Sequence, residues 1–189
     1  TSLMSVSIPD NATTIGEYAF YNCSSLDTIM ISTGIIDIAD YAFLNCSSLE
    51  AIGVDAQNEK YSSKDGVLLS KDESRLIIYP AGKTDSSYTL PKGVTAIEEN
   101  AFSSCEKLEA VTIPDSVLKI GSKAFKGCTA LVSINIPKGV SNIEQYAFAG
   151  CFSLKDIAIS EGVTSIYNNA FEFCEAIRSI DLPDSITYI

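Results

Sequence analysis

Apolar and polar positions recur along this chain with a regular period of 23 residues. In one copy of the pattern, Val111 and Ile113 alternate with polar neighbours, and Ala124 and Phe125 precede Cys128. Short alternation is typical of a strand with one buried face, whereas apolar residues at i, i+1 and i+4 favour one face of a helical turn. Each period therefore predicts one strand followed by one short helical turn.

The pair Ala-Phe, followed three residues later by Cys, occurs six times. Successive copies are 23 residues apart, except for a single step of 59 residues. A period of this size falls within the range of about 20–29 residues that leucine-rich repeats use. Because one unit cannot bury its own apolar side, the pattern predicts a solenoid of stacked coils with a continuous core.

The long step between the second and third copies predicts an insert at residues 55–87. Two apolar runs within residues 66–79 flank the polar segment Lys71–Ser74, which predicts a β-hairpin in place of the Ala-Phe turn. We expect residues 1–189 to form a single leucine-rich-repeat solenoid, as a fragment of a longer array whose end rungs favour end-to-end pairing in a crystal. Its inner strands are expected near residues 6–8, 29–31, 52–54, 88–90, 111–113, 134–136, 157–159 and 180–182.

Composition narrows the function classes. The formal net charge is −11, and an acidic surface repels phosphate backbones, so no nucleic-acid partner is expected. The chain has no histidine, which excludes Ser-His-Asp and Cys-His catalysis and every histidine-based metal site. No apolar run approaches the roughly 18 residues of a membrane span, so no direct membrane insertion is expected. The sequence thus predicts a protein that is not an enzyme and has no cofactor.

The six cysteines allow several interpretations. Thiolate metal sites usually need closely spaced pairs, and no two cysteines here are closer than 23 positions. Disulfides stay open, because rungs about 4.8 Å apart lie within the permitted Cα range, although parallel side chains do not bring their Cβ atoms to roughly 3.8 Å. A reactive thiol would need an open, electropositive setting. Packing is favoured, so six buried free thiols are predicted: Cys23, Cys46, Cys105, Cys128, Cys151 and Cys174.

The signature L-x-x-I-x-I-P…I-G-x-x-A-F-x-x-C, with the insert segment Tyr61–Pro80, resembles the BspA-like (treponemal-type) leucine-rich repeat family. The resemblance implies an α/β repeat fold: a right-handed solenoid with a curved parallel sheet on its concave side and short helical turns on its convex side. It also implies an extracellular or cell-surface location. Some members of the family act as adhesins, so the expected partner is a protein of a host or neighbouring cell.

Solenoids bind partners on their concave surface, where the outward strand positions lie. These positions here are small and mostly polar and lack the aromatic or Arg clusters that anchor tight interfaces. A structural spacer or stalk that presents another domain therefore stays open beside the adhesion module. The hairpin tip at Lys71–Arg75 is a second candidate surface. The candidate partner-binding residues are Met30, Thr112, Asn135, Asp156 and Asp181.

Overall fold

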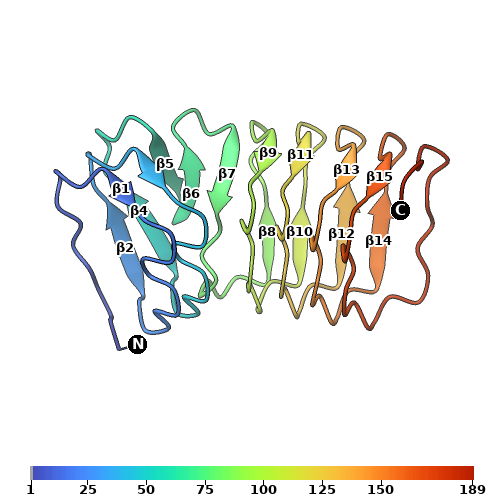
Figure 1. The fold of residues 1–189 in the computed structure, drawn as a ribbon, viewed down its shortest axis with the longest axis horizontal. Coiled ribbons are helices and arrows are strands. Elements are labelled where there is room, and N and C mark those ends of the chain that lie inside the picture. The colour runs from blue at the N-terminus through green and yellow to red at the C-terminus, as the bar shows by residue number, and fades with distance from the viewer. Residues whose placement is uncertain (1) are drawn as a thin grey trace. The chain divides into compact units, whose positions relative to one another are not determined.

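The computed structural model describes residues 2–189, which form two compact units that divide after Lys83. Unit 1 holds seven strands: β1 (Thr14–Ile15), β2 (Thr28–Ile31), β3 (Asp37–Ile38), β4 (Ala51–Val54), β5 (Tyr61–Lys64), β6 (Val67–Ser70) and β7 (Arg75–Ile78). Parallel pairs join β1 to β3 and β2 to β4, and antiparallel pairs join β5 to β6 and β6 to β7 (Figure 1). Unit 1 thus combines two stacked coils with a three-stranded insert.

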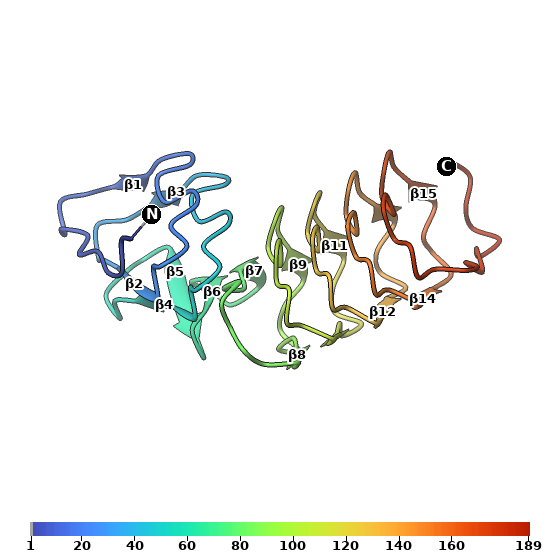
Figure 2. The same cartoon turned by 90° about the horizontal axis from the view of Figure 1, so that it is seen from below.

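Unit 2 begins at Thr84 and holds eight strands: β8 (Ser87–Thr89), β9 (Ala96–Ile97), β10 (Ala110–Thr112), β11 (Lys119–Ile120), β12 (Ser133–Ile136), β13 (Asn142–Ile143), β14 (Asp156–Ile159) and β15 (Ser165–Ile166). The order β14-β12-β10-β8 forms one parallel sheet, and β9–β11 and β13–β15 are further parallel pairs. Figure 2 shows these coils following one another within the unit, each with its long strand below and its short strand above. Unit 2 is therefore a β-solenoid.

The register of the parallel strands follows the sequence period. Ile134 pairs with Ile157, and Val111 pairs with Ile134, each 23 residues apart. Along β2 and β12 every second side chain is buried, so the alternation that predicted one-faced strands is confirmed. Because equivalent residues stack directly, their side chains face the same side of the sheet.

The two outermost predicted strands do not form. Residues 6–8 contribute only an isolated parallel bridge between Ser7 and Met30, and residues 180–182 belong to no strand. The prediction of an inner strand at 180–182 is therefore wrong. In register with β14, Arg178 would lie directly beside Lys155, and like charges in opposite positions destabilise strand pairing. An edge strand also has only one neighbour to bond to.

The Ala-Phe segments are not helical, which corrects the prediction of short helical turns. No helix occurs among residues 2–189. The residue before the Ala and the one four positions later adopt left-handed backbone angles, as at Tyr18 (φ 58°) and Asn22 (φ 58°), which interrupts any right-handed helix. Backbone N–H groups alternate instead: Cys23 donates to Phe20 O within its coil, whereas Phe20 donates to Ala42 O of the next coil.

The insert contains one more strand than the sequence indicated. β6 and β7 pair antiparallel within residues 66–79, and β5 pairs antiparallel with β6 across a turn at Asp65 (φ 51°) and Gly66 (φ 79°). Asp-Gly between two β-type runs is a strong hairpin signal that would have predicted this extra strand. Val67, Leu68 and Leu69 are all buried, so β6 forms the apolar centre of the insert.

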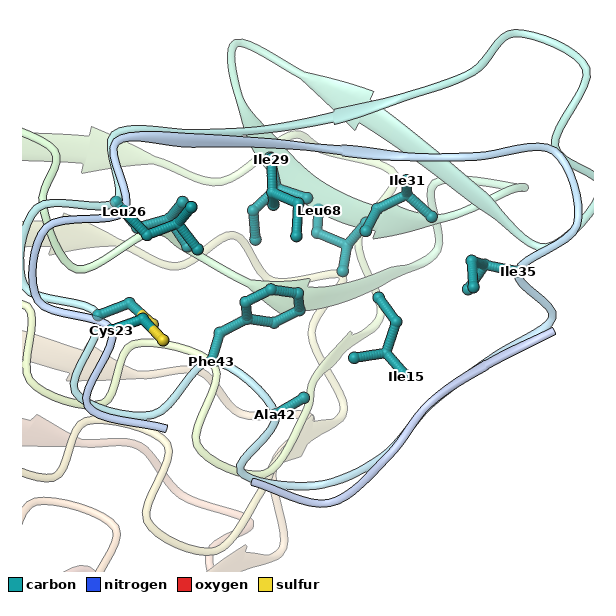
Figure 3. Packing of buried hydrophobic residues seen from close by; sticks show 12 residues of the cluster. Ile15, Cys23, Leu26, Ile29, Ile31, Ile35, Ala42, Phe43 and Leu68 are labelled. Carbon is teal, nitrogen blue, oxygen red and sulfur yellow. The ribbon is translucent and has the colours of Figure 1, made fainter. Parts of the chain in front are cut away.

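Stacked aromatic rings fill the core on the turn side of each unit. Phe20 and Phe43 of unit 1 stack with their ring centroids 5.3 Å apart. In unit 2, Phe102 and Phe125 stack at 4.9 Å, and Phe148 continues the column at 5.3 Å from Phe125. Such pairs contribute about 0.5–1.5 kcal/mol each beyond their buried area. Figure 3 shows Phe43 of unit 1 pointing into the same interior as Leu26, Ile29 and Cys23.

Candidate interaction surface

The cysteines form part of the core, and none of the six forms a disulfide. Five are buried and Cys174 is half-buried, because no later coil in residues 2–189 covers it. Cys128 donates its thiol hydrogen to the carbonyl oxygen of Phe102 at 3.0 Å, and Cys151 donates to Phe125 at 3.2 Å. These bonds tie each coil to the one before it.

Burial also makes three of these thiols, Cys46, Cys128 and Cys151, poor nucleophiles. The pKa of Cys46 is raised from its ordinary value of 9.0 to about 11, mainly by desolvation. Burial raises the pKa of Cys128 well above the usual range, and the thiol contact with Cys174 together with burial raises that of Cys151. Since the thiolate is the reactive species, these groups stay inert near neutral pH. Among residues 2–189, no three Cys, Asp or Glu side chains gather at a distance suited to a metal ion.

The exposed side chains of β8, β10, β12 and β14 form the surface that we name the strand face of unit 2. Thr112, Asn135 and Asp156 all lie on it and are exposed. Asn135 donates from Nδ2 to the carbonyl oxygen of Ile113 at 3.2 Å, which fixes its amide across two coils. The structure thus brings three of the candidate residues onto one sheet.

Met30 lies on a different surface, in β2 of unit 1. Its side chain is 57% exposed and covers Gly53, the residue beside it in β4. A Cβ added at Gly53 would come within 2.8 Å of the Met30 Cε atom. Met30 therefore rests flat against the sheet because its neighbour has no side chain, and it presents a flexible apolar surface to solvent.

A groove of about 640 Å³ opens beside β14, the edge strand of the four-stranded sheet of unit 2. It brings Asp156 of β14 together with the fifth candidate, Asp181, which belongs to the segment that fails to pair with β14. In Figure 1 this segment, drawn in dark red, bows away from β14. Three further charged residues line the groove that the sequence pattern did not indicate: Lys155, Glu175 and Arg178. The groove is lined by Lys155, Asp156, Ile157, Ala158, Glu175, Ala176, Arg178, Ser179 and Asp181.

The basic residues Lys155 and Arg178 could have been found from the sequence. The position just before the strand reads Glu109, Val132, Lys155 and Arg178 in successive coils, so its charge changes from acidic to basic along unit 2. Comparison of equivalent repeat positions would have found this change. The groove itself had no such signal, because the repeat pattern predicts a strand in its place.

The hairpin tip of unit 1 is rigid. Asp72 Oδ1 accepts hydrogen bonds from the hydroxyls of Ser70 at 2.6 Å and Ser74 at 2.8 Å. These bonds lower the pKa of Asp72 from 3.8 to about 2, and the bond from Ser70 has the largest effect. Lys71 donates from Nζ to the carbonyl oxygen of Ala56 at 3.1 Å. Asp72 therefore stays ionised near neutral pH and lies on a turn that hydrogen bonds hold in place.

Comparison with known proteins identifies the class. The sequence model of the BspA type leucine rich repeat region matches in six copies over residues 1–64 and 82–189. The chain belongs to this family. A search of curated proteins found no match. The fold and the repeat thus define a leucine-rich repeat protein of the BspA type.

Solved structures agree with this assignment. A leucine rich cell surface protein from Faecalibacterium prausnitzii is 33% identical over 98% of this chain and 55% of its own, with a TM-score of 0.83. A leucine-rich repeat protein from Eubacterium ventriosum is 27% identical over 95% of this chain and 60% of its own, with a TM-score of 0.77. The pneumococcal vaccine antigen PcpA, 22% identical over 99% of this chain and 62% of its own, has a TM-score of 0.61 and shows the fold alone.

The chain spans 55% and 60% of the length of the first two structures, so each of them contains substantial further sequence. Within residues 2–189, no helix is long and apolar enough to cross a membrane.

Proposed function

We propose that this chain is a non-enzymatic protein-binding module of a cell-surface or secreted protein, and that it serves adhesion. The single observation that carries the proposal is the strand face of unit 2. Thr112, Asn135 and Asp156 are exposed on the same face of this sheet, while Val111, Ile134 and Ile136 on its other face are buried. The repeat leaves the outward positions without a packing role, so their identities are available for recognition.

The location rests on the neighbours. The solved structure with 33% identity is described as a cell surface protein, and this supports a surface or secreted place for the present chain. A protein of a host or neighbouring cell is the partner that such a place favours. The binding residues that we propose are Thr112, Asn135, Asp156 and Asp181 in unit 2, and Met30 in unit 1.

Two arginine substitutions on the strand face test the proposal. A pull-down from host matrix and cell-surface extracts first identifies partners, which are then purified. Thr112→Arg with Asn135→Arg should weaken binding at least about tenfold, because two bulky charged side chains would stand in the interface. The matched control is Ser141→Arg with Gln145→Arg, at exposed positions on either side of β13. Equal affinities for both double variants would reject the strand face as the binding surface.

A spacer function is favoured by one observation. The outward-facing positions of β10, β12 and β14 include no aromatic side chain: they are Ala110, Thr112, Ser133, Asn135, Asp156 and Ala158. If every verified partner binds a domain outside this chain and none binds residues 1–189, the spacer function holds and the adhesion proposal fails.

A further inference from the structure

We infer that the groove beside β14 binds an extended segment of a partner protein, which adds to β14 as a strand and presents basic side chains outward. This inference deepens the proposed protein-binding function and rests on it. It assigns both the place in unit 2 and the chemistry of the segment that the place accepts.

One edge of β14 can form backbone hydrogen bonds with a further strand. Asp156 N–H donates to Val132 O at 3.3 Å and Ser160 N–H donates to Ile136 O at 3.2 Å, so these groups face β12. Backbone groups alternate in direction along a strand, and those of Ile157 and Ile159 therefore face the groove. Within residues 2–189, no hydrogen bond joins β14 to residues 179–182. An open edge of this kind is a template for an added strand.

On the core side of β14, the bound segment is expected to carry apolar side chains. Ile157 and Ile159 are only half-buried, whereas Ile134 and Ile136, their equivalents in β12, are 5% and 0% exposed. The difference arises because β12 has a strand on both sides and β14 has one on a single side. An added strand with an apolar residue at every second position would bury both isoleucines, and burial of apolar area is the main favourable term in such an association.

The charges on the outward side of the groove determine which residues the bound segment can carry at its outward-facing positions. Asp156 and Asp181 both line the groove, so the outward side chains of an inserted strand would lie near these carboxylates. Lys or Arg is the residue that this setting favours, and the net charge of −11 adds to the attraction. Lys155 and Arg178 line the same groove and belong to the position just before the strand. They favour an acidic group at that end of the segment, which fixes its register.

The chain's own segment Ser179–Leu182 is the competing occupant. It has the alternating pattern of an inner strand, with Ile180 and Leu182 at the core-facing positions. The structure holds it away from β14, and closing it would bring Arg178 beside Lys155. Its occupation of the edge in solution is therefore an outcome that the test must detect.

The test uses the whole chain and short synthetic peptides. The probe alternates Ile and Lys; one control peptide alternates Ile and Glu, and a second carries N-methyl groups on the backbone nitrogens that would bond to β14. We expect the Ile–Lys peptide to bind and to slow amide hydrogen exchange at Ile157 and Ile159. The Ile–Glu and N-methylated peptides should each bind at least about tenfold more weakly.

Charge variants complete the design. Asp156→Lys with Asp181→Lys should weaken the Ile–Lys peptide about tenfold, whereas the matched change Asp115→Lys with Glu161→Lys, at exposed positions that do not line the groove, should leave it unchanged. Equal binding of the N-methylated peptide, no binding of the probe, or slow exchange at Ile157 and Ile159 without peptide would each overturn the inference. None of these results depends on a verified partner, so they are separate from a failure of the strand face.

Discussion

Cys46 donates its thiol hydrogen to the backbone carbonyl of Phe20, which lies 3.1 Å away and 26 residues earlier. The same carbonyl accepts the N–H of Cys23, so one oxygen joins a bond within its coil to a bond from the next coil. The relationship recurs from Cys128 to Phe102 at 3.0 Å. The backbone N–H of the cysteine thus forms a hydrogen bond within its own coil, and its thiol forms one to the preceding coil.

Removing one such thiol should destabilise the solenoid. Cys128→Ala deletes a fully buried sulfur and its bond to Phe102, and we expect a loss of about 1–3 kcal/mol in the free energy of unfolding. Urea unfolding measures the change. Cys174→Ala, at the half-buried equivalent position, should cost less. Equal losses for the two variants would contradict the role assigned to burial.

Alkaline pH should weaken the fold through the same thiols. The pKa of Cys46 is raised by burial from 9.0 to about 11. Below pH 9 both states keep the proton and the stabilisation is complete; between pH 9 and 11 only the unfolded state releases it, so stability falls as pH rises. The urea midpoint, measured across this window, should fall more steeply for the wild type than for Cys46→Ala. Parallel curves would show that Cys46 ionises equally in both states.

Asn58 should be the most sensitive polar residue of unit 1. It is 0% exposed, its Nδ2 donates to Ser32 O and Ile35 O at 2.8 Å, and its Oδ1 accepts the N–H groups of Lys60 and Tyr61. Asn58→Asp removes both donors and places a carboxylate against two carbonyl oxygens, which should cost about 2–4 kcal/mol.

Thermal unfolding tests this expectation against a matched change. Gln57→Glu makes the same conversion of amide to acid at the exposed neighbouring position and should be nearly neutral. A similar melting temperature for both variants would mean that the Asn58 contacts do not hold the start of the insert.

At position 173, glycine should be more stabilising than alanine, because the backbone there has a left-handed angle. Phe173 is 63% exposed and has a φ of 58°, whereas Gly127 and Gly150 stand at the equivalent positions with φ of 75° and 76°. Left-handed angles cost a residue with a Cβ roughly 1–2 kcal/mol, which exceeds the entropic cost of glycine. We expect Phe173→Gly to raise the free energy of unfolding by up to about 1 kcal/mol relative to Phe173→Ala. A less stable glycine variant would refute the strain.

The strand half of the inner coils could be predicted from the sequence, because the alternation of residues such as Ile134 and Ile136 with polar neighbours fits a strand with one buried face. The turn half could not. Ala124, Phe125 and Cys128 satisfy a helical spacing, yet left-handed angles at Lys123 and Gly127 allow the same three side chains to face inward without a helix. The spacing therefore identified which side chains are buried and gave the wrong backbone for them.

The candidate surface was predicted in part. Outward positions such as Thr112 and Asn135 follow directly from alternation. The groove does not, because it lies where the alternating pattern of Ser179–Leu182 predicts a strand and the structure has none. Its basic residues, Lys155 and Arg178, lie just outside the strand positions that the alternation singled out.

Binding of a purified partner to strand-face variants tests the proposed function most directly. The affinity is measured for the wild type, for Thr112→Arg with Asn135→Arg, and for the control Ser141→Arg with Gln145→Arg, after unfolding curves show that all three are equally stable. The account predicts a loss of at least about tenfold for the strand-face variant alone. Unchanged affinity in that variant would contradict it.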